Sequence, residues 1–244
     1  MRRLFILALV WLAGSAFIPA VAADWSTKGE TLPYKVYWGP LSLGHATLTF
    51  TPGNGTYTAQ AQVKGSMPFF SMDDTWTATG TVQKNALVSK EYRAIQAENK
   101  YRANKRLTFN QQAHTMLYEN LHDTNEPKLT VKLPDGGQDP FSALYDLRKN
   151  GLPTQTISRE VMGLKRPFTL TIETPVAEER NGQKLLKVTL HKTDPAKPGT
   201  ETWHIWLTDD IERTPVQIDA QLKLGSFHAQ LENANAQTTE EENY

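Results

Sequence analysis

The sequence contains no cysteine, and this absence excludes several kinds of chemistry at once. Without thiols there is no disulfide, no thiolate nucleophile and no cysteine-based metal site. An excess of charge is also missing, because Lys and Arg together number 26 and so do Asp and Glu. We therefore expect no basic face for nucleic acid or anionic lipid.

Catalytic and cofactor motifs are absent as well: there is no P-loop, no dinucleotide fingerprint and no G-x-S-x-G elbow. The six histidines lack the spacing of zinc sites. Strand parity puts His45, His191 and His228 on polar faces, which is typical of hydrogen-bonded surface histidines. His204 shares a strand face with Trp206, and these two residues either line a groove or pack under a loop. We expect no metal and no cofactor.

Two acidic pairs, Asp73-Asp74 and Asp209-Asp210, are the remaining candidates for acid–base chemistry. Neighbouring residues in a strand point to opposite faces, so neither pair forms a dyad by itself. Asp209-Asp210 has the composition of a turn. The sequence therefore identifies no catalytic residue.

The first residues have the pattern of an export signal. A basic start, Met1–Arg3, precedes an apolar run, Leu4–Pro19, and the small residues Val21–Ala23 follow. We expect cleavage after Ala23 and a periplasmic protein. The alternative is an uncleaved membrane anchor, but the apolar run is short for a span. Residues 24–236 are expected to form a single β-rich domain, and the polar, acidic residues 237–244 a disordered tail.

The most informative stretch is WHIWLTDDIERTPVQIDAQLKLGSFHAQLE, Trp203–Glu232. Apolar residues alternate with polar ones from Val216 to Leu224, and the parity flips after Gly225-Ser226. This pattern predicts two strands joined by a two-residue type II′ turn at Gly225-Ser226. The cross-strand pairs would be Leu224 with Phe227, Leu222 with Ala229, and Ala220 with Leu231. Trp203, Ile205 and Leu207 predict a further strand.

Alternation elsewhere predicts about a dozen strands but one helix. The helix begins after the N-cap Asp139 and ends before Gly151, with Phe141, Leu144 and Tyr145 on one face. A single helix cannot cover so many strands, so the sheet must curl on itself. We expect a mainly β fold, a curved antiparallel sheet or incomplete β-barrel with the helix against its concave side. Two stacked sheets are the alternative.

Three stretches together resemble a known family: YKVYWGPLSLGHATLTF (Tyr34–Phe50), DPFSALYDLRKNG (Asp139–Gly151) and the C-terminal run. Their order and spacing are similar to those of the domain-of-unknown-function family 3108. The resemblance implies an envelope location and a β-rich fold. It also implies an architecture similar to that of lipoprotein-carrier half-barrels with a helical lid. The family supplies no catalytic residues.

The segment GSMPFFSM, Gly65–Met72, combines Met, Phe and Pro between predicted strands. Such a loop either packs against the core or contacts an apolar ligand. For the second case we place the mouth of the barrel at Met67, Phe69, Phe70 and Met72. Phe141 and Tyr145 would face them from the helix, and Trp38 and Trp203 would lie deeper.

These features favour a non-enzymatic periplasmic protein that binds an apolar or amphiphilic ligand, such as a lipid, an acyl chain or a lipoprotein. One alternative is a hydrolase acting on envelope glycan or lipid. Another is an interaction scaffold with a protein partner in outer-membrane complexes.

Overall fold

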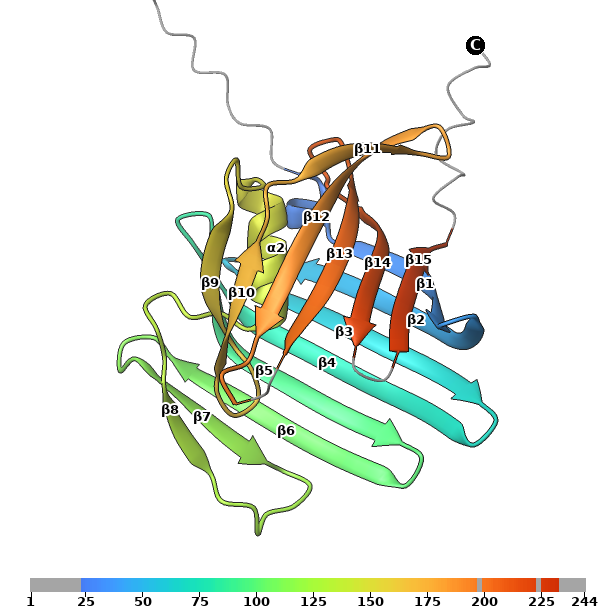
Figure 1. Ribbon diagram of the computed structural model, residues 1–244. Coiled ribbons are helices and arrows are strands. Elements are labelled where there is room, and N and C mark those ends of the chain that lie inside the picture. Colours follow the sequence, from blue (N-terminus) through green and yellow to red (C-terminus); the bar gives the residue numbers. More distant parts are fainter. Residues whose placement is uncertain (1–22, 197–198, 223–224, 233–244) are drawn as a thin grey trace, which may run out of the picture.

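The structure is a computed structural model that describes residues 23–196, 199–222 and 225–232. It contains two helices and fifteen strands (Figure 1). The helices are α1 (Trp25–Lys28) and α2 (Pro140–Asn150). The strands are β1 (Glu30–Trp38), β2 (Leu41–Pro52), β3 (Thr56–Met67), β4 (Phe70–Gln83), β5 (Ala86–Glu98), β6 (Tyr101–Asn110), β7 (Thr115–Asn120), β8 (Leu129–Lys132), β9 (Ile157–Met162), β10 (Pro167–Ile172), β11 (Val176–Arg180), β12 (Gln183–Thr193), β13 (Thr200–Thr208), β14 (Pro215–Leu222) and β15 (Gly225–Leu231).

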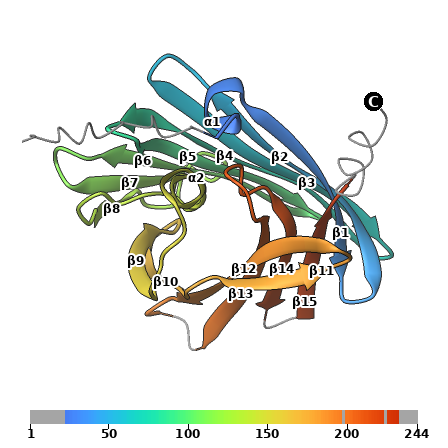
Figure 2. The same cartoon turned by 90° about the horizontal axis from the view of Figure 1, so that it is seen from above.

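All the strands belong to one antiparallel sheet, in the order β8-β7-β6-β5-β4-β3-β2-β1-β15-β14-β13-β12-β10-β9, with β11 also paired to β12. The pairing of β1 with β15, from Tyr34 opposite Leu231 to Trp38 opposite Phe227, joins the N-terminal meander to the C-terminal one. Seen from above, the sheet curls round so that its two ends approach each other (Figure 2). The predicted curved, incomplete barrel is confirmed.

The two ends of the sheet meet at a seam that is held mainly by side chains. Met162 of β9 is fully buried in a cluster formed otherwise by residues around β6–β8, namely Leu107, Phe109, Met116, Tyr118 and Leu133. The Met162 amide donates to the Gln138 carbonyl oxygen at 2.8 Å, and the ammonium of Lys165 pairs with the carboxylate of Glu126. The sheet itself stays open, and its two ends are in contact through these side chains where the strand ladder stops.

Helix α2 lies inside the curve of the sheet (Figure 2). Its N-cap is Asp139, as predicted, whose carboxylate accepts from the amides of Phe141 at 2.9 Å and Ser142 at 3.0 Å. Tyr145 packs into the cluster formed with β1–β5, whereas Leu147 packs into the cluster formed with β10, β12 and β13. The helix thus fills the space between the two walls at one end of the barrel, which we call the closed end.

The predicted register of the C-terminal hairpin is wrong by four residues. Ala220, predicted opposite Leu231, lies opposite Phe227; Leu222 lies opposite Gly225 and Ile218 opposite Ala229, so the connection falls at residues 223–224, outside the described residues. A shift by an even number of residues keeps every side chain on its face, so parity could not detect it. Gly225 belongs to β15, and a Cβ there would lie 3.0 Å from Nε1 of Trp38.

Several elements were not expected from the sequence, among them α1, β8, β9 and β11. Within the described residues, the short helix α1 accompanies the predicted helix α2. The predicted signal peptide, apart from Ala23, and the acidic tail lie outside the described residues. Within those residues, no helix is long and apolar enough to cross a membrane.

Candidate functional site

The C-terminal wall carries a row of large apolar side chains on its concave face. Tyr34 and Val36 of β1 belong to the buried cluster around Tyr145, and Trp38 continues the same face of the strand. The register then runs from Trp38 to Phe227, Ala220, Trp203 and Leu190 across five neighbouring strands. Trp38, Phe227 and Trp203 are only half-buried. The wall therefore presents aromatic surface to the interior.

The opposite wall is built from the β3–β4 hairpin, and here the sequence interpretation needs correction. GSMPFFSM is not an irregular loop: β3 runs to Met67, β4 starts at Phe70, and these two residues pair across a two-residue turn. Proline at Pro68 followed by a positive φ of 69° at Phe69 is the arrangement of a type II turn. Phe69 is fully exposed at the tip, because the turn points it away from the sheet.

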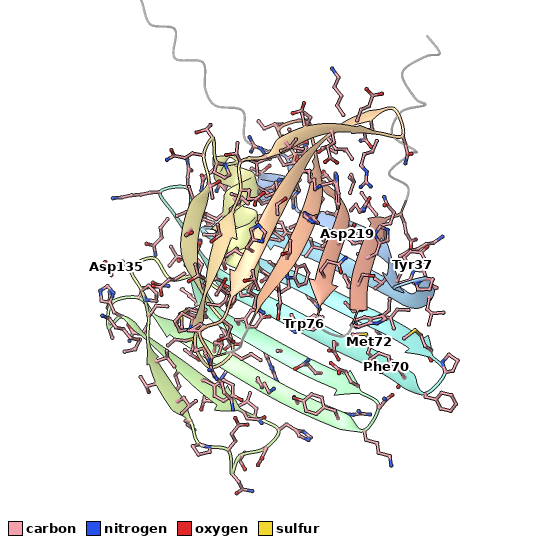
Figure 3. All side chains as sticks on the ribbon, viewed as in Figure 1. Tyr37, Phe70, Met72, Trp76, Asp135 and Asp219 are labelled. Carbon is pink, nitrogen blue, oxygen red and sulfur yellow. The ribbon has the colours of Figure 1, made fainter. Side chains whose placement is uncertain are left out.

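Four residues of this hairpin face inward. Three of them were predicted to line the mouth, and the fourth, Trp76, was not. Met67, Phe70 and Met72 are half-buried and pack against the main core cluster. Trp76 has the parity of Ala78, a core residue, and lies opposite Ala61 of β3 and Ala94 of β5. Figure 3 shows Phe70, Met72 and Trp76 following one another along β4. The hairpin extends beyond α2, towards the end of the barrel that the helix leaves open (Figure 1).

The two helix residues assigned to the mouth have different environments. Phe141 is half-buried, with its ring 6.0 Å from that of Tyr92. Tyr145 is fully buried, 4.6 Å from the ring of Phe50 and 5.1 Å from that of Trp25. Tyr145 therefore belongs to the closed end of the barrel, and Phe141 is the helix residue that a ligand at the open end would reach.

Ionic and hydrogen-bonded groups hold the closed end together. The guanidinium of Arg148 is fully buried against the Glu30 carboxylate, with Nη2 to Oε2 at 2.9 Å, and lies 4.7 Å from the Trp25 ring. Arg148 lies in the last turn of the helix, and its charge is neutralised there by a strand residue. The arrangement fixes α2 to β1.

A second buried network surrounds the N-cap of α2. The Asp139 carboxylate accepts from Ser89 at 2.6 Å and from Ser142, whose hydroxyl is 2.5 Å from that of Tyr57. Burial raises the pKa of Asp139, and burial also raises the pKa of Tyr57. The group contains two serines and a carboxylate, but Asp139 and both serines are fully buried and no histidine is among their hydrogen-bond partners. Its arrangement is that of a structural cap.

One pair of carboxyl groups does come together at the open end. Asp74 is fully buried on β4 and accepts from the Ala97 amide at 2.9 Å and from Gln96 at 3.2 Å. Glu98 lies opposite Met72 on β5. Burial, followed by the hydrogen bond to Asp74 and its charge, raises the pKa of Glu98.

Three histidines lie on the convex face and pair with carboxylates there. His228 pairs with Asp219 at 2.6 Å, His191 with Glu173 at 2.8 Å and His45 with Glu232 at 2.7 Å, so all three are hydrogen-bonded at the surface, as predicted. Within the part of the chain that the structure describes, no group of three or more His, Asp or Glu side chains could hold a metal ion.

Trp206 lies on the same face as His204, with the two rings 5.9 Å apart. Its indole donates to Glu178 of β11 at 2.9 Å, and the Arg180 guanidinium lies 4.4 Å from the ring. The Trp206 indole is thus buried rather than lining a groove, but the side chains that cover it come from β11, a strand paired to β12 in the same sheet, and not from the predicted loop.

An open depression of about 500 Å³ borders the β3–β4 hairpin. Gly44, Gly65 and Met72 lie side by side in the register beneath it, and a Cβ on Gly44 would lie 2.1 Å from the Lys64 carbonyl oxygen. Its lining is mostly polar or glycine: Ser42, Leu43, Gly44, Lys64, Gly65, Ser66, Met72 and Asp73. The depression widens the surface beside Met72 but does not itself form an apolar pocket.

Comparison with known proteins places the chain in a family. A model described as "Protein of unknown function (DUF3108)" matches residues 33–232. The chain belongs to the DUF3108 family. The fold of this DUF3108 chain is similar to the crystal structure of a beta-barrel-like protein of domain of unknown function DUF1849 from Brucella abortus. The TM-score is 0.59 at 11% identity, over 83% of this chain and 95% of that chain. No functionally curated protein matches. The predicted family resemblance is confirmed, and at this identity the structural likeness shows the fold alone.

In the DUF3108 chain, then, the assigned residues fall into separate groups. Met67, Phe70 and Met72 lie together on one wall, and Trp38 and Trp203 lie on the other. Phe69 is at an exposed tip. Sequence reasoning missed Trp76, Phe227 and the Asp74–Glu98 pair. The parity of β4 could have found Trp76, because Trp76 lies on the same strand face as Ala78. The pairing between distant strands had no local signal.

Proposed function

We propose that this protein binds an apolar or amphiphilic molecule, such as a lipid, an acyl chain or a lipoprotein, at the open end of its curved sheet. We propose further that it does so without catalysis, in the periplasm after export. The observation that carries the proposal is the pair of concave walls beyond α2. One presents Trp38 and Phe227, and the other presents Phe70, Met72 and Trp76.

The half-burial of these side chains supports binding. A chain of this length could cover them, since it does cover their neighbours on the same strand face. Val36 and Tyr34, one and two steps along the same face from Trp38, are 0% and 2% exposed. Large aromatic and Met side chains left half-covered on a concave surface are typical of sites for apolar ligands. Glu98, which lies opposite Met72 in the strand pairing, would serve the polar part of an amphiphile.

Exposed apolar side chains at the hairpin tips add to this surface. Leu41, Phe69 and Tyr101 are 57%, 102% and 47% exposed and lie at the successive turns β1–β2, β3–β4 and β5–β6. They would offer first contacts to an apolar chain entering from solvent.

A fluorescent fatty acid, dansyl-undecanoic acid, tests the proposal directly. Trp38→Ala removes an aromatic side chain from the concave face, and Tyr37→Ala removes its neighbour from the convex face, where Tyr37 lies 5.7 Å from the His228 ring. We expect saturable binding that Trp38→Ala weakens at least tenfold and Tyr37→Ala leaves within about twofold; tenfold corresponds to about 1.4 kcal/mol. Equal effects of the two substitutions would refute a concave site.

A hydrolase acting on envelope glycan or lipid is the second candidate, and Asp74 with Glu98 is the observation that favours it. Asp74 already accepts from a backbone amide, which suits a structural role better. Turnover of acyl esters or glycans by the purified protein, abolished by Glu98→Gln, would favour the hydrolase. A scaffold would instead yield a stable protein partner by crosslinking and no small ligand.

A further inference from the structure

Glu212, in the connection between β13 and β14, gathers hydrogen bonds from the start of the described chain. Its carboxylate accepts from the Asp24 amide nitrogen at 2.8 Å and from the Trp25 amide nitrogen at 3.4 Å. Its carbonyl oxygen accepts from the Trp25 indole at 3.2 Å and from Arg148 at 3.1 Å. One loop residue thus binds the chain start, about 190 residues away in sequence, together with helix α2.

Trp25 closes the barrel at this end. It is 2% exposed, and its ring lies 5.0 Å from that of Phe50 and 5.1 Å from that of Tyr145. The position of Asp24 is therefore set by a buried neighbour, and the Asp24 nitrogen remains at Glu212 whatever precedes it.

We propose that Glu212 is the binding site for the α-ammonium group that processing after Ala23 creates on Asp24. This inference rests on the export part of the proposed function. Hydrolysis adds one water across the Ala23–Asp24 peptide bond: the carboxylate stays on Ala23, and the amine stays on Asp24. A terminal amine with a pKa near 7.7–8.0 is protonated at neutral pH. A neutral amide donor facing Glu212 therefore becomes a cation with three donors.

The surroundings of Ala23 set the order of events. Ala23 is 6% exposed, and its carbonyl oxygen accepts from the Ser26 amide at 3.0 Å and the Ser26 hydroxyl at 2.8 Å. Because Ala23 is buried and its carbonyl oxygen is hydrogen-bonded in the folded barrel, we place cleavage before folding. The contacts of the Ala23 carbonyl are lost on cleavage, and the new ion pair takes their place.

Other charges face the same position. Lys28 pairs with the Asp24 side chain at 2.8 Å; this hydrogen bond and the charge of Asp24 raise the pKa of Lys28, and the charge of Glu212 adds to them. Arg148 is neutralised by Glu30, and the Arg213 guanidinium donates to the Arg148 carbonyl oxygen at 2.6 Å. Because Lys28 and Arg148 already have carboxylate partners, Glu212 is the acidic group placed to bind the amine.

The test compares purified chains that begin at Asp24, at Ala22, or at an Nα-acetylated Asp24, each with Glu212 or Glu212→Gln. Pairing raises the pKa of the amine in the folded state, so its stabilisation is complete below about pH 8 and disappears as pH rises through the folded-state pKa. We expect the Asp24 chain to melt about 2–4 °C above the other two at pH 6.5. The difference should vanish by pH 10 and in Glu212→Gln, but persist in the exposed control Glu179→Gln.

Equal melting temperatures of the three chains at pH 6.5 would overturn the proposal, as would a difference that survives Glu212→Gln. The intact mass of the exported protein is the second readout, and it should correspond to a chain starting at Asp24. A different start would overturn the proposal on that ground alone. The fatty-acid titration, which uses the concave face, would be unaffected by either failure.

Discussion

Trp38 and Phe227 lie directly opposite each other in the pairing of β1 with β15, the first and last strands in chain order. Both are half-buried on the concave face, and Nε1 of Trp38 lies 3.0 Å from where a Gly225 side chain would begin. The contact that joins the two halves of the barrel is thus also part of the proposed binding surface. Changes near Trp38 should report on both.

Replacement of Gly225 by alanine tests this contact. Gly225 has a φ of +128° and the Trp38 indole beside it, whereas Gly182 has a φ of +77° with open space around it. We expect Gly182→Ala to cost about 1 kcal/mol of unfolding free energy through backbone strain alone, and Gly225→Ala about 2–3 kcal/mol. Urea denaturation measures both. Equal costs would mean that Trp38 does not restrict Gly225.

Removal of one partner of the buried Arg148–Glu30 pair should be severe. Glu30→Gln leaves an uncompensated guanidinium inside the barrel, and Arg148→Met leaves a carboxylate that is nearly as buried. Each is expected to lower the unfolding free energy by about 3–5 kcal/mol. The double variant should lose less than the sum of the two, because neither charge is then left alone. Additive losses in chemical denaturation would contradict a direct interaction.

Acid should weaken the seam of the barrel. The Lys165 ammonium, with help from Asn120 and Tyr118, lowers the pKa of Glu126 to about 2. A depressed pKa gives stability that is present above the unfolded value, near 4.3, and lost as pH falls towards 2. Wild type should therefore exceed Glu126→Gln in melting temperature at pH 6, and the gap should narrow between pH 5 and pH 2. The solvent-exposed control Glu160→Gln should show no such convergence; a constant gap for Glu126→Gln would argue against the ion pair.

Local sequence signals predicted elements and faces but not long-range pairing. The Asp139 cap and the alternation of Ile218 and Ala220 correctly gave a helix start and a buried strand face. The predicted hairpin register was wrong by four residues, because a shift by an even number of residues leaves every side chain on the same face. The burial of Arg148 had no local signal, because its partner, Glu30, is 118 residues away. Trp76 was missed because its role depends on how far the sheet extends beyond α2.

The central claim is that the open end of the sheet binds an apolar or amphiphilic molecule, and native mass spectrometry of the protein purified without detergent tests it most directly. We predict a co-purifying species of lipid or acyl-chain mass in the wild type and in the convex-face control Tyr37→Ala. Phe70→Ala should lose that species while its melting temperature stays close to wild type, because a half-buried side chain contributes less to packing than a core Phe, whose loss costs about 3–5 kcal/mol. A wild-type protein with no bound species, together with a large drop in the melting temperature of Phe70→Ala, would contradict the account and make this hairpin part of the core.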